Sequence, residues 1–299
     1  MKSILKWVVR LAVLLVVVAI GAVVAANLLY ERKRDRVVVL DVKGVTVGSD
    51  EATLARGNYL FATRGCGECH APNGAGRVMV DDPAGGVYIR SPNITSGGVA
   101  AGYTEVDWVR VIRHGVKRDG RAVLVMPSEE FNRLTDADVA ALIAYLRSLP
   151  PAAGGVTEFR VPLPLKALYG FGLMQDAAEK IDHSLPPAQP VPEGETVEHG
   201  KYVANLCIGC HGPGFSGGRI PDGAPDWPPA SNLTPGAGTV MTTYDSADKL
   251  RAMFRSGKRL DGSAIAAMPF GALRELTETD VAALHAYLKA LPPRPAGGR

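Results

Sequence analysis

The sequence predicts an all-α protein in which an N-terminal transmembrane helix precedes two tandem copies of one small helical domain. Three observations predict this fold: an uncharged apolar run over residues 11–30, a sequence unit that occurs twice, and a capped amphipathic segment that ends each copy. In both end segments the apolar residues recur at helical spacing, and no long stretch alternates as a strand does.

The apolar run is long enough to cross a membrane. About 20 residues at 1.5 Å each span roughly 30 Å, the thickness of a hydrocarbon core. The run also exceeds the roughly 7–15 residues of a signal-peptide core. We therefore expect residues 1–30 to be an uncleaved anchor. A signal peptide cleaved after Val24-Ala25-Ala26 is the alternative.

The repeated unit is found by comparing the chain with itself. Its matching pieces occur in the same order in both copies, which indicates two domains of one fold. They are Gly57-Asn58-Tyr59 and Gly200-Lys201-Tyr202, CGECH at 66–70 and CIGCH at 207–211, Asn93-Ile94-Thr95 and Asn232-Leu233-Thr234, Asp119-Gly120 and Asp261-Gly262, and Met126-Pro127 and Met268-Pro269.

Both copies end in similar segments, LTDADVAALIAYLRSLPP at 134–151 and LTETDVAALHAYLKALPP at 276–293. Thr135 with Asp138, and Thr277 with Asp280, have the spacing of a capping box with Asp in place of Glu, so each segment is expected to be a helix with a defined start. The proline pairs end both helices. Two further helices are expected in each copy; in the first copy they run from about residue 50 into CGECH and over residues 104–114.

The region between the copies is rich in proline, which predicts an extended connector with a short helix within residues 165–181. The expected organisation is an anchor (1–30), a tether (31–48), a first domain (49–151), the connector (152–192) and a second domain (193–299).

Composition limits the function. The 33 basic and 30 acidic residues give a net charge of +3, which does not indicate a nucleic-acid surface. The chain has 34 glycines and 22 prolines but only 6% aromatic residues, which suits compact helical modules joined by irregular chain.

All four cysteines lie in the two Cys-x-x-Cys-His motifs, the attachment signature of a c-type haem. Cysteines at i and i+3 share one side of a helical turn and reach the two vinyl groups of a porphyrin. The long gap between the pairs excludes zinc-finger spacing, and the βαβ pattern of a thioredoxin-like dithiol is not seen. We expect two covalent haem c groups, held by Cys66, Cys69 and His70, and by Cys207, Cys210 and His211.

A haem iron with one histidine ligand needs a sixth ligand, and methionine is a common choice in electron carriers. Met126 and Met268 are the methionines that match between the copies, at nearly equal spacing after His70 and His211, and each precedes a proline. We expect these two to be axial ligands rather than core residues.

The remaining histidines and the large aromatic residues receive structural roles. His114, His183, His199 and His285 have no matching histidine in the other copy and are expected to be surface or structural residues. Tyr59, Tyr202, Tyr145, Tyr287, Trp108 and Trp227 are expected in haem pockets or helix contacts.

These motifs resemble class I cytochrome c modules, and in particular the multihaem cytochrome c subunits of bacterial membrane-bound alcohol, aldehyde and gluconate dehydrogenases. The resemblance lies in Gly-x-Tyr before CxxCH, SPNIT (91–95), SNLT (231–234), MP and the LTDADVAALIAYL ending. It implies two tandem class I cytochrome c domains, with His70 and Met126, and His211 and Met268, as axial pairs. Those subunits usually carry three haem modules, whereas this chain has two.

The expected function is electron transfer rather than catalysis, because two His/Met irons leave no open site for a substrate. Because haem is attached outside the cytoplasm, we expect the domains on the periplasmic side of the cytoplasmic membrane. The basic residues after the span, Arg32, Lys33, Arg34 and Arg36, outnumber those before it, which by the positive-inside rule alone would predict the opposite orientation. Long domains, however, translocate largely regardless of loop charge. The expected partners are the membrane and a redox protein such as a dehydrogenase, a quinone-linked complex or a terminal oxidase, with no nucleic acid. A dihaem redox enzyme, such as a cytochrome c peroxidase or a thiosulfate-oxidising cytochrome, is the alternative.

Overall fold

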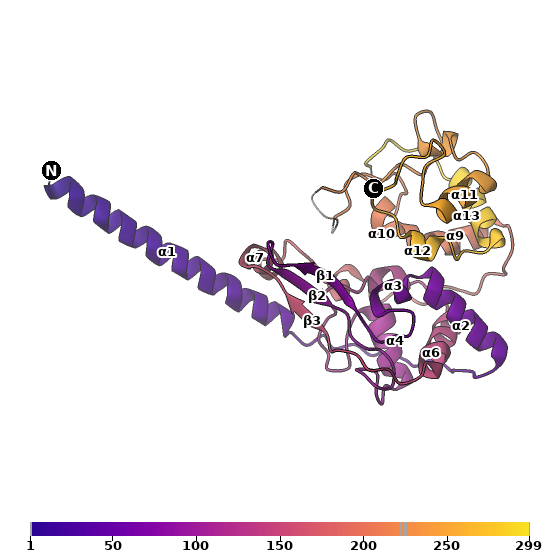
Figure 1. Ribbon diagram of the computed structural model, residues 1–299, viewed down its shortest axis with the longest axis horizontal. Coiled ribbons are helices and arrows are strands. Elements are labelled where there is room, and N and C mark those ends of the chain that lie inside the picture. Colours follow the sequence, from indigo (N-terminus) through magenta and orange to yellow (C-terminus); the bar gives the residue numbers. More distant parts are fainter. Residues whose placement is uncertain (1, 222, 224–225, 299) are drawn as a thin grey trace.

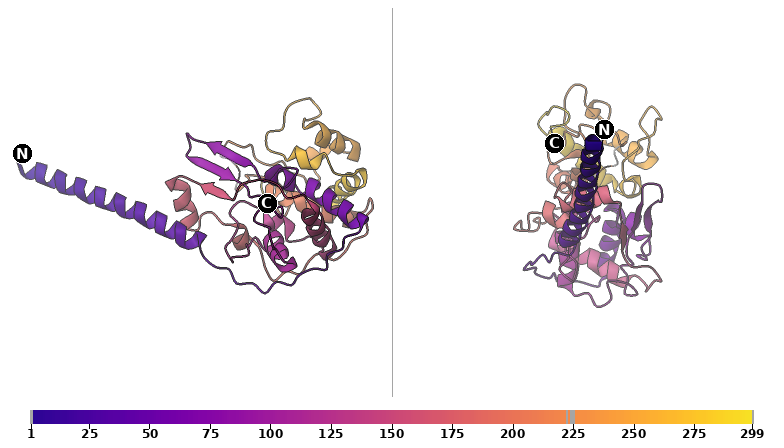
Figure 2. Two further views of the ribbon diagram at one scale, coloured as in Figure 1. Left: turned by 60° about the horizontal axis from the view of Figure 1, so that its bottom comes forward. Right: turned by 90° about the vertical axis from the view of Figure 1, so that its left-hand side faces the viewer.

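The computed structural model describes residues 2–221, 223 and 226–298, so Met1 and Arg299, the outer ends of the predicted anchor and second domain, lie outside the described residues. One long helix projects away from two helical domains that lie against each other (Figure 1). Two further directions show the same arrangement (Figure 2). The all-α prediction is confirmed, with one small sheet added.

The projecting helix, α1 (Lys2–Arg34), contains the apolar run, has a mean hydropathy of 2.9 in its most apolar window and is long enough to cross a membrane. Most of its side chains are exposed. Near its C-terminal end, Ala26 and Tyr30 are buried against α7 of the connector.

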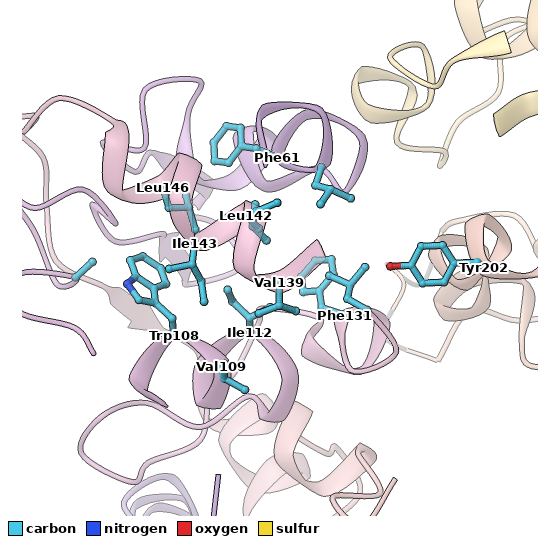
Figure 3. Close-up of a cluster of buried hydrophobic side chains, with 14 residues drawn as sticks. Phe61, Trp108, Val109, Ile112, Phe131, Val139, Leu142, Ile143, Leu146 and Tyr202 are labelled. Atoms are coloured by element: carbon cyan, nitrogen blue, oxygen red, sulfur yellow. The ribbon is translucent and has the colours of Figure 1, made fainter. Parts of the chain in front are cut away.

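The first domain contains α2 (Glu51–Thr63), α3 (Cys66–His70), α4 (Glu105–His114), α5 (Ser128–Phe131) and α6 (Asp136–Ser148). The helices predicted before CGECH, at 104–114 and at the end of the copy are therefore confirmed. Thr104 begins α4 with a complete capping box to Asp107. Helix α2 lies across α6, and buried apolar residues of α2, α4 and α6 form the core (Figure 3).

The second domain repeats this plan with α9 (Val197–Val203), η1 (Ala204–Cys207), α10 (Ile208–His211), η2 (Val240–Thr242), α11 (Ala247–Ser256), α12 (Phe270–Leu273) and α13 (Glu278–Ala290). Helix α9 lies across α13 as α2 lies across α6. Its core is separate and includes Val203, Phe254 and Leu284.

A glycine permits each of these helix crossings. A Cβ atom on Gly57 would lie 2.0 Å from the carbonyl oxygen of Ala141, and one on Gly200 would lie 1.9 Å from that of Ala283. The glycine of each Gly-x-Tyr motif therefore brings the two helix backbones closer than any side chain allows.

The tether and the connector are more ordered than the sequence suggests. Val42, Val45 and Val47 of the tether pack on the first core. The connector holds β3 (Glu158–Arg160), α7 (Leu163–Gly170) and α8 (Ala177–Lys180), so it is not extended throughout, and two short helices replace the one predicted. A hairpin of β1 (Val78–Asp82) and β2 (Val87–Arg90) in the first domain pairs with β3 to form an antiparallel sheet, β1-β2-β3.

The capping boxes predicted for α6 and α13 form only in part. Thr135 accepts a bond from the backbone of Asp138, and Thr277 accepts one from Asp280, as predicted. In a complete capping box, the aspartate side chain would also accept a hydrogen bond from the backbone N–H of the threonine. Here that N–H donates instead to the hydroxyl of a tyrosine from the other domain.

Candidate functional site

Each Cys-x-x-Cys-His motif forms a tight helical turn at the edge of its domain core. Gly65, in the left-handed region at φ 70°, turns the chain from α2 into α3, which is the first motif. In the second motif, η1 ends at Cys207 and α10 continues to His211. Burial raises the pKa of Cys66 and that of Cys207 to about 12, so both thiols are neutral near pH 7.

The two motif histidines have the same hydrogen bond. Nδ1 of His70 lies 3.0 Å from the carbonyl oxygen of Pro92, and Nδ1 of His211 lies 2.8 Å from that of Ser231. A ring whose Nδ1–H donates to a carbonyl presents the Nε2 lone pair to a metal, as metal-bound histidines do. Burial lowers the pKa of His70, which keeps the ring neutral, as an iron ligand must be.

The SPNIT and SNLT motifs hold these carbonyl groups in place. Oδ1 of Asn93 accepts hydrogen bonds from the backbone and the hydroxyl of Thr95, at 2.9 and 2.8 Å, and Asn232 does the same with Thr234. Both asparagines are buried. Each motif is therefore a fixed Asx turn whose preceding carbonyl orients the histidine.

The structure brings each expected methionine to the core that holds the matching cysteine. Met126 and Cys66 pack on the first core, and Met268 and Cys207 pack on the second. After each Met-Pro pair the chain turns the same way, with a 2.9 Å hydrogen bond from the second residue after the methionine back to the methionine carbonyl. The donor set of two thiols, one oriented histidine and one thioether in each domain fits a c-type haem.

The two domains meet through a reciprocal pair of contacts. The hydroxyl of Tyr202 donates to Oδ2 of Asp138 at 2.5 Å and accepts from the backbone N–H of Thr135 at 3.2 Å. In the matching positions, the hydroxyl of Tyr59 donates to Asp280 and accepts from Thr277 at 3.3 Å. Figure 3 shows Tyr202 reaching from the second domain toward Phe131 at the edge of the first core.

Each of these aspartates also binds a basic residue of its own domain. The guanidinium of Arg56 donates two hydrogen bonds to Asp138, at 2.8 and 2.9 Å, while Nε2 of His199 lies 2.6 Å from Asp280. Burial raises the pKa of Asp138, but the bonds from Arg56 and Tyr202 outweigh burial and lower it. Asp138 is therefore a carboxylate. Burial and this carboxylate raise the pKa of Tyr202 to about 12, which keeps its hydroxyl protonated.

Both haem-attachment turns lie at this interface. A Cβ atom on Gly209 of the second turn would lie 2.0 Å from Oε1 of Glu130, on α5 of the first domain. A Cβ atom on Gly271, on α12 of the second domain, would lie 2.2 Å from Oε1 of Glu68 in the first turn. Each turn thus contacts the short helix after the Met-Pro pair of the other domain.

The sequence reasoning missed this interface. The match between Tyr59 and Tyr202 predicts haem-pocket or helix-contact roles, but it does not predict that each tyrosine contacts a helix of the other domain. Arg56 and His199 occupy matching positions with different side chains, so comparing the copies gave no signal for them. His199 has the buried structural role expected of it. His114 and His183 face each other, with their Nδ1 atoms 3.0 Å apart.

Comparison with known proteins agrees with this geometry. The sequence model of the family described as Cytochrome c matches residues 54–150 and 197–292. The chain is 29% identical to the cytochrome c subunit of the quinone alcohol dehydrogenase of Gluconobacter oxydans, over 83% of this chain and 57% of the relative. It is 26% identical to the fructose dehydrogenase cytochrome subunit of Gluconobacter japonicus, with 83% and 54% covered.

A third relative, the gluconate 2-dehydrogenase cytochrome c subunit of Pantoea cypripedii, is 26% identical over 81% of this chain and 60% of the relative. The chain therefore spans a little more than half the length of these curated relatives. The two family matches cover more than half of the chain, and each contains one CxxCH motif with its oriented histidine. This chain belongs to the cytochrome c family and carries two haem c groups in two domains.

Proposed function

We propose that this chain is a membrane-anchored electron-transfer subunit, which accepts electrons from a periplasmic dehydrogenase and passes them through two haem domains to a respiratory acceptor. Cys66, Cys69 and His70 attach one haem, with Met126 as the sixth ligand. Cys207, Cys210 and His211 attach the other, with Met268 as the sixth ligand. The domains stand on the outer side of the cytoplasmic membrane, with α1 as a single span.

The interface between the domains is the observation that carries this proposal. The attachment turn of each domain lies against the short helix that follows the Met-Pro pair of the other. An isolated pair of carriers would need neither this contact nor the reciprocal tyrosine bonds. A chain that passes an electron from one haem to the other needs both groups close together and fixed in orientation.

The protein holds each haem in a way that suits a carrier. Each bound haem supplies a site that takes up and releases one electron. The Asx turns fix the histidines, and the methionines are attached to fixed turns beside the cores. His70 with Met126, and His211 with Met268, would hold the two irons, and this ligand pair would raise the reduction potential and leave a substrate no open iron.

The partner and the location rest on the relatives and on α1. The relatives' names place them with alcohol, fructose and gluconate dehydrogenases. A dehydrogenase of a small alcohol or sugar-derived substrate is therefore the proposed donor. The exposed apolar surface of α1 has the length and hydropathy of a membrane span.

The purified full-length holoprotein distinguishes a carrier from a dihaem enzyme. We expect an intact mass with two covalent haems, a low-spin ferric spectrum, no carbon monoxide binding by the ferrous protein, and no peroxide turnover. A C66S/C69S variant should carry one haem, while the remaining haem keeps its spectrum. A high-spin ferric haem or peroxide turnover in the wild type would favour the enzyme, and a single covalent haem would refute the dihaem assignment.

A further inference from the structure

Besides α1, the connector carries an exposed apolar surface that belongs to neither core. Residues 163–174 read LPLKALYGFGLM and comprise α7 and the turn after it. Phe171 is 61% exposed and Leu173 is 74% exposed, and Leu168 and Met174 are also exposed. Isolated exposed apolar residues need no explanation, but several side by side on one short segment mark a binding surface.

This segment is fastened to the C-terminal end of α1. The ring of Tyr169 meets the ring of Tyr30 edge-on at 5.9 Å, and Nζ of Lys166 lies 3.1 Å from Oδ1 of Asn27. A Cβ atom on Gly170 would lie 2.8 Å from the backbone nitrogen of Tyr30, so the two backbones are in close contact. Figure 2 shows α7 beside this end of α1.

The contacts advance along both elements together. Lys166 meets Asn27, Gly170 meets Tyr30, and the carbonyl of Met174 accepts a 2.8 Å bond from Lys33. Asn27 and Tyr30 belong to the uncharged run, whereas Lys33 lies beyond it. At 1.5 Å per residue, Asn27 and its partner Lys166 lie roughly 5 Å deeper in the apolar run than Tyr30. Phe171 and Leu173 follow Gly170 and precede Met174, so they lie between the levels of Tyr30 and Lys33. That is the outer edge of the uncharged run, where a headgroup region would be.

The residue types of this segment suit the headgroup region of a membrane. The ring of Phe171 is exposed together with Leu168, Leu173 and Met174. Lys166 lies beside the C-terminal end of α1, and Lys33 lies in that end. Aromatic rings and basic side chains with apolar stems are enriched at membrane interfaces. A protein that covered this surface would be an additional partner. The bilayer that α1 would cross lies beside the surface without any additional partner.

The rest of the structure makes this contact rigid. Arg36 forms a salt bridge of 2.7 Å with the buried carboxylate of Asp176, which also accepts a hydrogen bond from Tyr169. Strand β3 leads directly into α7 and pairs with the hairpin of the first domain. Any surface that holds residues 163–174 therefore also fixes the orientation of the first haem domain.

We propose that residues 163–174 form a second, monotopic membrane contact, which places Phe171 and Leu173 in the headgroup region of the outer leaflet beside α1 and holds the haem domains at a set angle to the bilayer. The proposal rests on the anchoring role of α1. The occupant of the surface is phospholipid of the same membrane; a protein partner is the alternative, favoured if position 173 gives no lipid adduct above its solvent control.

Photocrosslinking in vesicles tests this with the full-length holoprotein. A benzophenone amino acid replaces Leu173, Val24 or Leu260 in separate variants, which are reconstituted into vesicles of phosphatidylethanolamine and phosphatidylglycerol and irradiated. Val24 is 51% exposed within the apolar run, and Leu260 is 46% exposed in the second domain, so they serve as membrane and solvent controls. Intact mass measures the lipid adduct.

We expect adducts at positions 173 and 24 that exceed the adduct at position 260 severalfold. Adducts at 24 but none above the control at 173 would overturn the second contact and leave the anchor intact. Loss of the adduct at 24 as well would instead refute the anchor. Adding F171S to the position-173 variant should reduce its adduct severalfold; an unchanged adduct would show that the apolar side chains do not insert.

Discussion

The hydroxyl of Tyr202 donates a 2.5 Å hydrogen bond to Asp138 and accepts one from the backbone of Thr135, so it completes the cap of a helix in the other domain. In a complete capping box the side chain at the third helical position would bind that backbone group itself. Here the hydroxyl of Tyr202 lies between the backbone N–H of Thr135 and the carboxylate of Asp138 and bonds to both. Tyr59 does the same for Thr277 and Asp280, which makes each domain part of the other's helix start.

We expect Tyr202→Phe to weaken the interface, because it removes one bond to a buried carboxylate and leaves the Thr135 amide without its acceptor. The cost should be about 1–3 kcal/mol in the free energy of unfolding. Electron exchange between the haems, measured after rapid reduction of one of them, should slow, and Tyr59→Phe should act alike. Tyr287→Phe is the control, since its ring packs on Phe215 within the second domain. Equal exchange rates in all three variants would contradict a coupling role.

Gly57→Ala should destabilise the first domain strongly. Its Cβ atom would meet the Ala141 carbonyl at 2.0 Å and the Tyr145 Cβ at 2.6 Å, and backbone cannot move aside as a side chain can. Overpacking of this kind costs about 1–3 kcal/mol or more. Chemical denaturation followed by the haem absorbance measures it. Gly194→Ala has only Thr196 within 4 Å, at 3.8 Å, and should be neutral; equal effects would mean that the close crossing is not required.

The helices were predictable because each carries its own local signals. Thr104, Thr135 and Thr277 begin helices where the sequence indicates, since capping depends on residues three positions away. The repeat also indicates which methionine lies beside the core of each domain, Met126 at the first and Met268 at the second. Their roles as iron ligands stay predictions. The domain boundaries stay predictions, although the family matches at 54–150 and 197–292 fall within the proposed limits.

The interface and the sheet were not predictable, because their partners are distant in the chain. Asp138 resembles a capping residue in sequence, yet its carboxylate binds Arg56 and Tyr202. Strand β3 is three residues long and gains its partners only when the connector folds back on the hairpin. Short strands with no repeated pattern carry little signal of their own.

Glu130 should make stability depend on pH. Burial, together with Glu129, raises its pKa from 4.5 to about 7, against the opposing charges of Arg64 and Lys180. Between these pH values the folded chain binds the proton more tightly than the unfolded chain, so the stability that this group contributes at low pH is lost as the pH rises from about 4.5 to about 7.

Glu130→Gln should therefore gain stability relative to wild type over that range, by up to about 3 kcal/mol at pH 8. Guanidinium denaturation midpoints at pH 5 and pH 8 measure the difference. The exposed Glu195→Gln serves as the control and should shift neither midpoint. A difference between wild type and Glu130→Gln that does not change with pH would contradict the raised pKa.

Met126→Ala and Met268→Ala test the sixth ligands. Each should lower the reduction potential of one haem, because the methionine sulfur favours the reduced iron, and should let that iron bind carbon monoxide. Potentiometric titration with optical detection, and carbon monoxide difference spectra of the ferrous protein, measure the two effects. The other haem should keep its potential in each variant.

Met253→Ala separates ligation from packing. Met253 is buried in the same core as Met268, so its loss should cost about 2–5 kcal/mol of stability but leave both potentials unchanged. If Met268→Ala behaved like Met253→Ala, with lower stability and an unaltered haem spectrum, then Met268 would be a core residue and the second iron would take its sixth ligand from elsewhere.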